Sequence, residues 1–166
     1  MVVRCTKKML DLRGGRNVAL SEPAPSDEDW YLNLVWIDRQ KCLLLTHSDT
    51  LFSLFRAGVR VVELRPLGAY LIAAIETDLR AEGLPADTFS ELDRNDVRIA
   101  KTASRSILGF MNEMASELEW HIAHDGGLHR TDIDDLNHAL RRMLRNRRGD
   151  YVRPIDLVNQ RLNARG

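Results

Sequence analysis

The sequence predicts an α+β fold, a small N-terminal antiparallel sheet packed against three to four helices. The first observation is a pair of β-type runs at residues 30–37 and 41–46, separated by a connection short enough for a hairpin. The second is a change of hydrophobic period after Pro66, from two residues to about 3.6. The third is a long amphipathic segment over residues 103–124. Strands that precede helices in this way are typical of the α+β class.

The first thirty residues predict a strand, a helix and a loop. Residues 2–5 form a short strand, and Thr6 caps a brief helix that Gly14-Gly15 ends. Residues 19–29 contain two prolines, two serines and four acidic residues, which predicts a surface loop. Large apolar side chains lie on both faces of the run 30–37, so we expect a central strand that is covered on both sides.

The middle of the chain predicts a short helix, a third strand and a longer helix. Residues 48–55 form the short helix, which Gly58 closes, and residues 59–64 return as the third strand. Apolar residues at helical spacing over 67–79 predict the longer helix. Residues 88–97 are polar and predict an irregular segment or a single turn.

The C-terminal part predicts three helices. The first covers residues 103–124 and stops at Gly126-Gly127. The second covers residues 132–145, capped by Thr131, and the third begins at Pro154 and runs through Leu162. The sequence contains no internal repeat and no linker, so we expect one domain over residues 1–166.

Composition narrows the classes of function. The chain has 166 residues, of which 44% are hydrophobic, enough for one core. Its 24 basic and 24 acidic residues cancel, so any electrostatic binding has to come from a local patch. The N-terminus lacks the apolar stretch of a signal peptide, and no run approaches the ~20 apolar residues of a membrane span. We expect a cytoplasmic protein without membrane contact, in which Cys5 and Cys42 stay reduced.

Familiar catalytic and cofactor motifs are absent from the sequence. Four residues of the segment 103–124 are spaced like metal ligands, but one helix rarely supplies a whole site. Because such side chains are ordinary on a polar helix face, we expect no metal and no cofactor. These four residues are Glu113, Glu117, His121 and His124.

Two histidines could act as a general base. A catalytic triad would combine His47 or His129 as the base with a serine, Ser104 or Ser106, and with Asp49. Triads are recognised by geometry, and nothing in this spacing enforces one. The sequence therefore identifies no catalytic residue.

Gly109 stands inside the predicted helix, where glycine costs about 1 kcal/mol relative to alanine. We interpret it as a packing glycine that lets a neighbouring backbone approach. Asn112 would lie near that contact and bond to it.

The clearest charged feature is a C-terminal arginine patch that only Asp150 opposes. Guanidinium groups suit phosphate and carboxylate. The patch would bind an anion or nucleic acid, contact a partner protein, or pair within the chain with the acids of residues 27–29 or 132–135. Its members are Arg141, Arg142, Arg145, Arg147, Arg148 and Arg153.

Three motifs carry a resemblance to a known family. They are Arg-Cys-Thr-Lys-Lys at residues 4–8, Trp-Ile-Asp-Arg-Gln-Lys-Cys-Leu-Leu at 36–44 and Arg-Ser-Ile-Leu-Gly-Phe-Met-Asn at 105–112. In this order they resemble a bacterial family of small proteins described as a domain of unknown function. The likeness extends to about Asn137, and the arginine-rich tail departs from the family pattern. The resemblance implies a compact, cytoplasmic, bacterial protein and implies no activity.

The same resemblance suggests where a shared site would lie. The polar members of the motifs would bind a small anionic ligand if they meet beside a sheet edge. They are Cys5, Lys7, Lys8, Asp38, Arg39, Lys41 and Asn112.

The preferred functional interpretation is a non-enzymatic binding or regulatory module that acts on a protein or nucleic-acid partner. The alternative is an enzyme with an uncatalogued site around the three motifs. The oligomeric state stays open. The residues expected to bind a ligand or partner are Lys7, Lys8, Asp38, Arg39, Asn112, Arg141, Arg142, Arg145 and Arg148.

Overall fold

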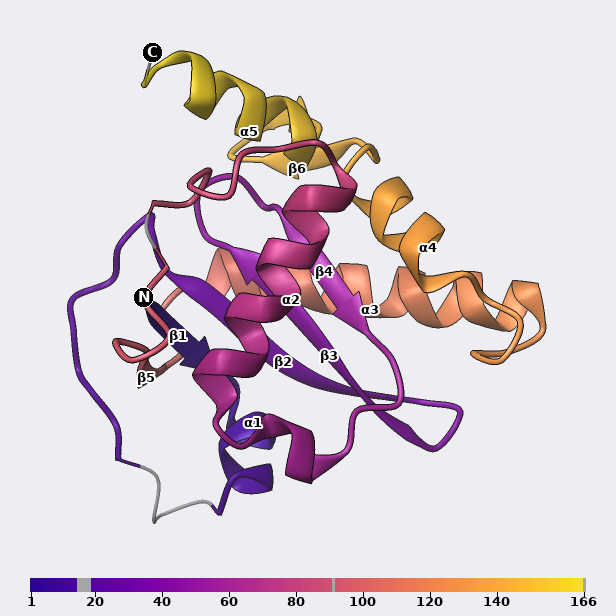
Figure 1. The fold of residues 1–166 in the computed structure, drawn as a ribbon. Helices are drawn as coiled ribbons and strands as arrows, with labels where there is room; N and C mark the ends of the chain where they lie inside the picture. The colour runs from indigo at the N-terminus through magenta and orange to yellow at the C-terminus, as the bar shows by residue number, and fades with distance from the viewer. Residues whose placement is uncertain (15–18, 91, 166) are drawn as a thin grey trace.

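A computed structural model describes residues 1–14, 19–90 and 92–165 (Figure 1). Its elements follow the α+β order that the sequence predicts. In chain order they are β1 (Val2–Cys5), α1 (Lys7–Leu12), β2 (Trp30–Ile37), β3 (Gln40–His47), β4 (Ser53–Arg56), a 3₁₀ turn (Val61–Leu64), α2 (Leu67–Ala81), β5 (Arg98–Lys101), α3 (Arg105–Asp125), α4 (Ile133–Leu140), β6 (Arg145–Arg147), β7 (Asp150–Val152) and α5 (Pro154–Asn163).

Five strands form a mixed sheet in the order β4-β3-β2-β1-β5. The expected antiparallel hairpin of β2 with β3 is confirmed, and β3 also pairs antiparallel with β4, a strand that the sequence did not predict. The expectation of an antiparallel sheet is wrong for β1, which runs parallel to both β2 and β5. A parallel pair needs a crossover connection of a dozen or more residues, and residues 6–29 are long enough to supply it.

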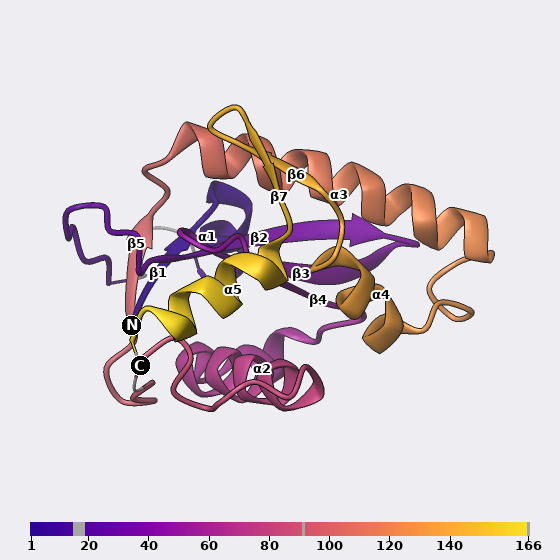
Figure 2. The same ribbon diagram turned by 90° about the horizontal axis from the view of Figure 1, so that it is seen from above.

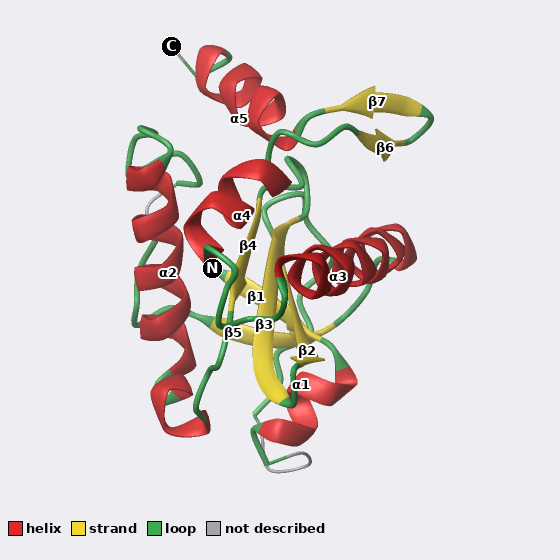
Figure 3. Cartoon of the chain, turned by 90° about the vertical axis from the view of Figure 1, so that its right-hand side faces the viewer, coloured by secondary structure: helices red, strands yellow, loops and turns green. Residues whose placement is uncertain are grey.

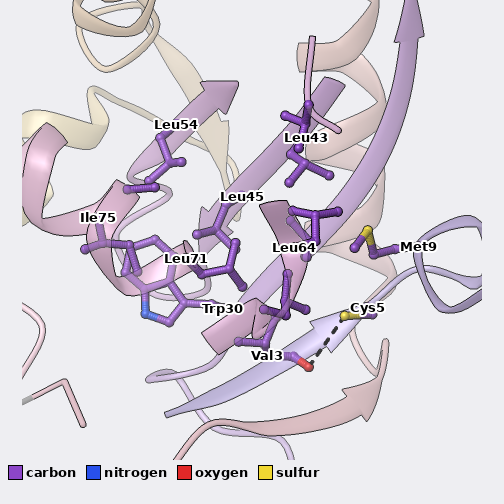
Figure 4. Packing of buried hydrophobic residues seen from close by; sticks show 14 of the residues in the cluster. Val3, Cys5, Met9, Trp30, Leu43, Leu45, Leu54, Leu64, Leu71 and Ile75 are labelled. Carbon is purple, nitrogen blue, oxygen red and sulfur yellow. Dashed lines mark hydrogen bonds between the residues drawn. The ribbon is translucent and has the colours of Figure 1, made fainter. Parts of the chain in front are cut away.

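The sheet is covered on both faces, as expected for β2. Helix α2 lies on one side of the sheet and α3 lies on the other (Figures 2 and 3). Alternate residues of β2 enter two separate cores: Trp30 and Leu32 pack on the α2 side, and Tyr31 and Val35 pack on the α3 side. Figure 4 shows the first core, where Trp30 lies close to side chains of α2 and β3. Cys5 and Cys42 are both free, and they belong to different cores.

Two expectations between residues 48 and 64 are wrong. Residues 53–56 form the strand β4 rather than a helix, and residues 61–64 form a 3₁₀ turn rather than a strand. In β4, Leu54 packs in the α2-side core while Phe55 packs in the α3-side core. A strand buries neighbouring side chains on opposite faces, which a short one-sided helix does not.

The C-terminal region departs from expectation after Leu140. Helix α4 ends there instead of at residue 145, and Asp132 caps it in place of Thr131. The arginine-rich segment forms the hairpin β6–β7, whose two-residue turn has positive φ at Arg148 and Gly149. The hairpin extends away from the sheet beside α3 (Figure 3). The strand β5 was also not expected, because Arg98–Lys101 is too short and too polar to show a β pattern.

The remaining helices agree with expectation. Helix α3 ends at Gly126, which adopts a φ of 93°, and Pro154 opens α5. Of the Gly14-Gly15 stop predicted for α1, Gly15 lies outside the described residues. No described helix combines the length and the apolar character needed to cross a membrane.

The interpretation of Gly109 as a packing glycine is wrong. Gly109 is exposed on α3, and a Cβ built there would meet no neighbouring atom within 4 Å. Asn112 is also exposed on α3, so it does not lie in a tight interelement contact.

Candidate functional site

A pocket of about 240 Å³ lies beside the N-terminal end of α3. Three other segments, far apart in the chain, complete it: residues 25–31, 48–51 and 146–148. We call it the hairpin pocket, because the turn of β6–β7 forms one wall. Its lining residues are Pro25, Ser26, Asp27, Tyr31, Ser48, Leu51, Ser104, Ser106, Ile107, Phe110, Asn146, Arg147 and Arg148.

The start of α3 supplies two hydroxyl groups to the hairpin pocket. Ser104 is the N-cap, and its Oγ accepts a hydrogen bond from the backbone N–H of Ile107 at 3.3 Å. The hydroxyls of Ser104 and Ser106 lie 3.0 Å apart. Ser106 belongs to the third of the family-like motifs, so that motif forms part of the pocket wall.

Arg4, from the first motif, holds the opposite wall in place. Its side chain is buried beneath the loop that precedes β2, and its Nε donates to the Asp29 carboxylate at 2.5 Å. Its remaining nitrogens donate to the backbone carbonyls of Pro23 at 2.9 Å and Lys101 at 3.1 Å. Asp29 also accepts from the backbone N–H of Ser26 at 3.0 Å. Arg4 therefore fixes the loop against the strand that leads into α3.

Sequence reasoning missed Arg4 as a positioning residue. The available signal was a charged residue inside the apolar strand Val2–Cys5, because a buried arginine needs partners. The partners themselves come from distant segments, and the sequence does not reveal them.

The hairpin carries three arginines with different surroundings, of which Arg147 and Arg148 line the pocket. Arg145 pairs with Glu117 at 2.5 Å and lies over the ring of Phe110. Arg147 pairs with Asp49 at 2.5 Å. Arg148 is exposed at the turn, and no carboxylate within residues 1–14, 19–90 and 92–165 pairs with it.

The interior of the hairpin pocket combines hydroxyl donors with an apolar floor. Leu51, Ile107 and Phe110 supply the floor. Burial raises the pKa of Tyr31, while the charge of Arg4 acts in the opposite direction. The Tyr31 hydroxyl therefore stays protonated at neutral pH. Such a pocket can hold a small polar group on an apolar stem.

The triad considered from the sequence is not assembled. None of the described residues that line the hairpin pocket is a histidine. His47 is buried against Trp30 and Phe89, its Nδ1 accepts from the backbone N–H of Thr50, and burial lowers its pKa to about 3. Asp49 is occupied by Arg147. The two serines therefore have no imidazole base beside them.

The predicted arginine patch is not one helical face. Arg141 is buried and forms ion pairs with Asp78 and Glu82, and Arg142 pairs with Glu82 at 2.7 Å. Both arginines join α4 to α2, whereas Arg145 and Arg147 belong to β6. The alternative of pairing within the chain is correct for these four arginines. The acids expected for it are wrong, because the partners lie outside residues 27–29 and 132–135.

The residues of the remaining motif prediction are not brought together. Lys7 and Lys8 are exposed on α1, which packs Met9 into the α2-side core, and Asn112 is exposed on α3 across the sheet. Asp38 and Arg39 form the β2–β3 turn. The Asp38 carboxylate accepts from the backbone N–H of Leu128 at 2.7 Å, so it secures the α3–α4 loop.

The metal-like spacing on α3 does not produce a ligand cluster. Within the described residues, no three or more His, Cys, Asp or Glu side chains gather around a possible metal position. Glu117 bonds to Arg145, and His124 stacks on Trp120.

Comparison with known protein families gives a match over most of the chain. A family model with the description "Domain of unknown function (DUF6933)" matches residues 2–157. This range contains the whole hairpin β6–β7, so the expectation that the likeness ends at about Asn137, before the arginine-rich tail, is wrong. No curated protein matches the chain.

Proposed function

The chain belongs to the DUF6933 family, a domain of unknown function, and we propose that it is a binding module that recognises a partner protein through the hairpin pocket. One observation carries the proposal. The pocket joins two motifs that lie a hundred residues apart: Arg4 holds one wall, and Ser106 and Ile107 form another. Function-bearing side chains are commonly placed on loops that a rigid scaffold positions, and the pocket has this construction.

The charge distribution favours a protein over a nucleic acid. Nucleic-acid binding draws its affinity from several phosphate contacts made by free lysines and arginines. Arg141, Arg142, Arg145 and Arg147 are each paired with an acid of the same chain. The formal net charge of the whole chain is zero. These four arginines are therefore not free to follow a phosphate backbone.

Exposed apolar side chains beside the hairpin pocket also favour a protein partner. Leu144 is 60% exposed and Tyr151 is 73% exposed. Tyr151 is paired across the hairpin with Asn146, which lines the pocket. Directly paired residues share one face of a two-stranded sheet. Exposed aromatic and aliphatic side chains are typical of protein-contact surfaces.

The enzyme alternative has weaker support. It relied on Lys7, Lys8, Asp38, Arg39 and Asn112, which the structure distributes over α1, the β2–β3 turn and α3. The lining of the hairpin pocket supplies serines, but the described residues place no histidine beside them.

A selection from a random heptapeptide display library tests the proposal. The variant Ser106→Phe changes an exposed residue and places a ring in the hairpin pocket. Peptides enriched on the wild type should lose at least tenfold in affinity for Ser106→Phe and should keep their affinity for Trp120→Ala, an exposed control on α3. Thermal melts should show that both variants are folded. Failure to enrich any peptide, or equal affinity for all three proteins, would refute the proposed site.

A further inference from the structure

We infer that the hairpin pocket recognises an anionic side chain of the partner, a phosphorylated or carboxylate group, through the guanidinium of Arg148. This assignment rests on the proposed function and specifies the chemistry of its ligand.

Of the two arginines that line the hairpin pocket, Arg148 is the one whose guanidinium is not paired with a carboxylate of the described residues. Arg147 already gives a charge-assisted hydrogen bond to Asp49 at 2.5 Å. For Arg148, the described residues provide no such carboxylate, and its side chain is exposed at the pocket. A guanidinium has five N–H donors in a fixed planar arrangement, which matches the oxygens of carboxylate and phosphate.

The hairpin turn holds Arg148 at this position. Arg148 and Gly149 both have positive φ, as in a type I′ turn, and the backbone N–H of Gly149 donates to the Asn146 side chain at 3.1 Å. Arg145 anchors the base of the hairpin to Glu117 on α3. The charge is therefore presented from an ordered turn.

Neutral hydroxyl groups that line the same pocket could donate hydrogen bonds to the oxygens of the anion. The hydroxyls of Ser104 and Ser106 lie 3.0 Å apart at the start of α3, and Tyr31 of β2 also lines the pocket. Hydrogen bonds from such donors to an ionised acceptor are stronger than those to a neutral one. The apolar floor of Leu51, Ile107 and Phe110 can contact the methylene groups that carry the anion.

Asp27 provides a test of the sign of the ligand charge. Its carboxylate belongs to an exposed residue that also lines the hairpin pocket, and its backbone carbonyl accepts from the N–H of Asp49 at 3.1 Å. An anionic ligand is repelled by this carboxylate, so Asp27→Asn should improve its binding. A cationic or zwitterionic ligand would instead need the carboxylate, and the same substitution would weaken it.

The experiment is an NMR titration of ¹⁵N-labelled protein with three small probes: N-acetyl-phosphoserine methylamide, N-acetyl-glutamate methylamide and N-acetyl-serine methylamide. One or both acidic probes should shift amide signals at residues 104–107 and 146–149, and the neutral serine probe should not. The tighter acidic probe identifies phosphate or carboxylate as the preferred source of the charge.

Three variants give the comparison its controls. Arg148→Gln should weaken the acidic probes about tenfold or more, the loss typical of one hydrogen-bonded charge contact. Arg153→Gln makes the same change of net charge at an exposed arginine that is absent from the pocket lining, and it should leave the affinity within about twofold. Asp27→Asn should increase the affinity.

Each contrary result has a separate meaning. Equal binding of acidic probes to wild type and Arg148→Gln, or weaker binding to Asp27→Asn, would overturn the anionic assignment. If the neutral probe binds as well as the acidic ones, the assignment fails while the peptide-binding function stands. Binding of a 12-base-pair DNA duplex that Arg148→Gln abolishes, without binding of either acidic probe, would replace the peptide with a nucleic acid.

Discussion

At the scale of single residues, Gly109 gives a direct test of local packing. It lies inside α3 on an exposed position, and a Cβ there would meet no neighbouring atom within 4 Å. Gly109→Ala should therefore stabilise the protein by about 0.5–1 kcal/mol, because alanine loses less backbone entropy in a helix. Urea unfolding monitored by circular dichroism measures the change.

The matched control is Gly126→Ala at the end of the same helix. Gly126 has a φ of 93°, so an alanine there is strained and should destabilise the protein by about 1 kcal/mol. If Gly109→Ala destabilised the protein as well, the helix would be constrained at Gly109 by a contact that the structure does not contain.

His47 predicts a pH dependence of stability. Burial lowers its pKa from 6.5 to about 3, and the nearby charge of Arg161 acts in the same direction. The unfolded chain therefore binds this proton more readily than the folded one. The corresponding stability is complete above about pH 6.5 and is lost progressively as the pH falls toward 3.

Chemical denaturation between pH 6.5 and 4.5 measures the His47 contribution. Over this range the free energy of unfolding should fall more steeply for the wild type than for His47→Gln. The difference in slope should approach about 1.4 kcal/mol per pH unit, the value for one proton. Parallel pH profiles would show that His47 is accessible to protons in the folded state.

At the scale of secondary-structure elements, α4 covers the β4 edge of the sheet. Asn137 accepts from the backbone N–H of Phe55 at 2.6 Å and donates to the Phe55 carbonyl at 3.0 Å. Arg141 donates to the Ser53 carbonyl at 3.0 Å. These side chains occupy backbone groups of β4 that another strand would otherwise pair with, which protects an edge strand from association.

Arg141 also neutralises two buried carboxylates, and this predicts a large loss of stability on substitution. Arg141→Met would remove the guanidinium that pairs with Asp78 and Glu82 while leaving both acids buried. We expect destabilisation by about 3 kcal/mol or more in urea unfolding. Arg153→Met, at an exposed arginine, should change stability by less than about 0.5 kcal/mol. Equal effects of the two substitutions would mean that the α4–α2 ion pairs contribute little.

The hairpin β6–β7 shows why a strand can lack a recognisable hydrophobic period. Its strands have three residues each and read Arg-Asn-Arg and Asp-Tyr-Val, without apolar alternation. Arg145 replaces the usual apolar anchor, since its stem is buried and its charge is paired with Glu117. A pattern search based on apolar side chains therefore finds no strand in these residues.

At the scale of the whole molecule, the sheet separates two cores and the charges are paired locally. The α2-side core contains Cys5 and the α3-side core contains Cys42, so the sheet itself keeps the two thiols apart. Ion pairs lie both in the interior, as for Arg4 with Asp29, and nearer the surface, as for Arg145 with Glu117. At the hairpin pocket, Arg147 is paired with Asp49, whereas Arg148 has no carboxylate partner among the described residues. The proposed recognition of an anion therefore depends on Arg148.

The sequence by itself determined the α+β class, the central position of β2, the helix α3 with its stop at Gly126, and the start of α5 at Pro154. These features depend on side chains that are near one another in the chain. Hydrophobic period records which faces of a segment are buried, and a capping glycine acts within one turn. Each can be recognised without knowledge of any distant segment.

Only the tertiary structure decided the parallel pairing of β1, the strand β4 and the composition of the hairpin pocket. The decisive pairs are distant in sequence: Arg4 and Asp29 are 25 residues apart, and Arg147 and Asp49 are 98 apart. An arginine in the sequence predicts that some acid will pair with it, but many acids satisfy that requirement equally. Which acid pairs with a given arginine depends on which strands pair and which helix covers which face of the sheet. The hydrophobic period of a single segment contains no information about these long-range contacts.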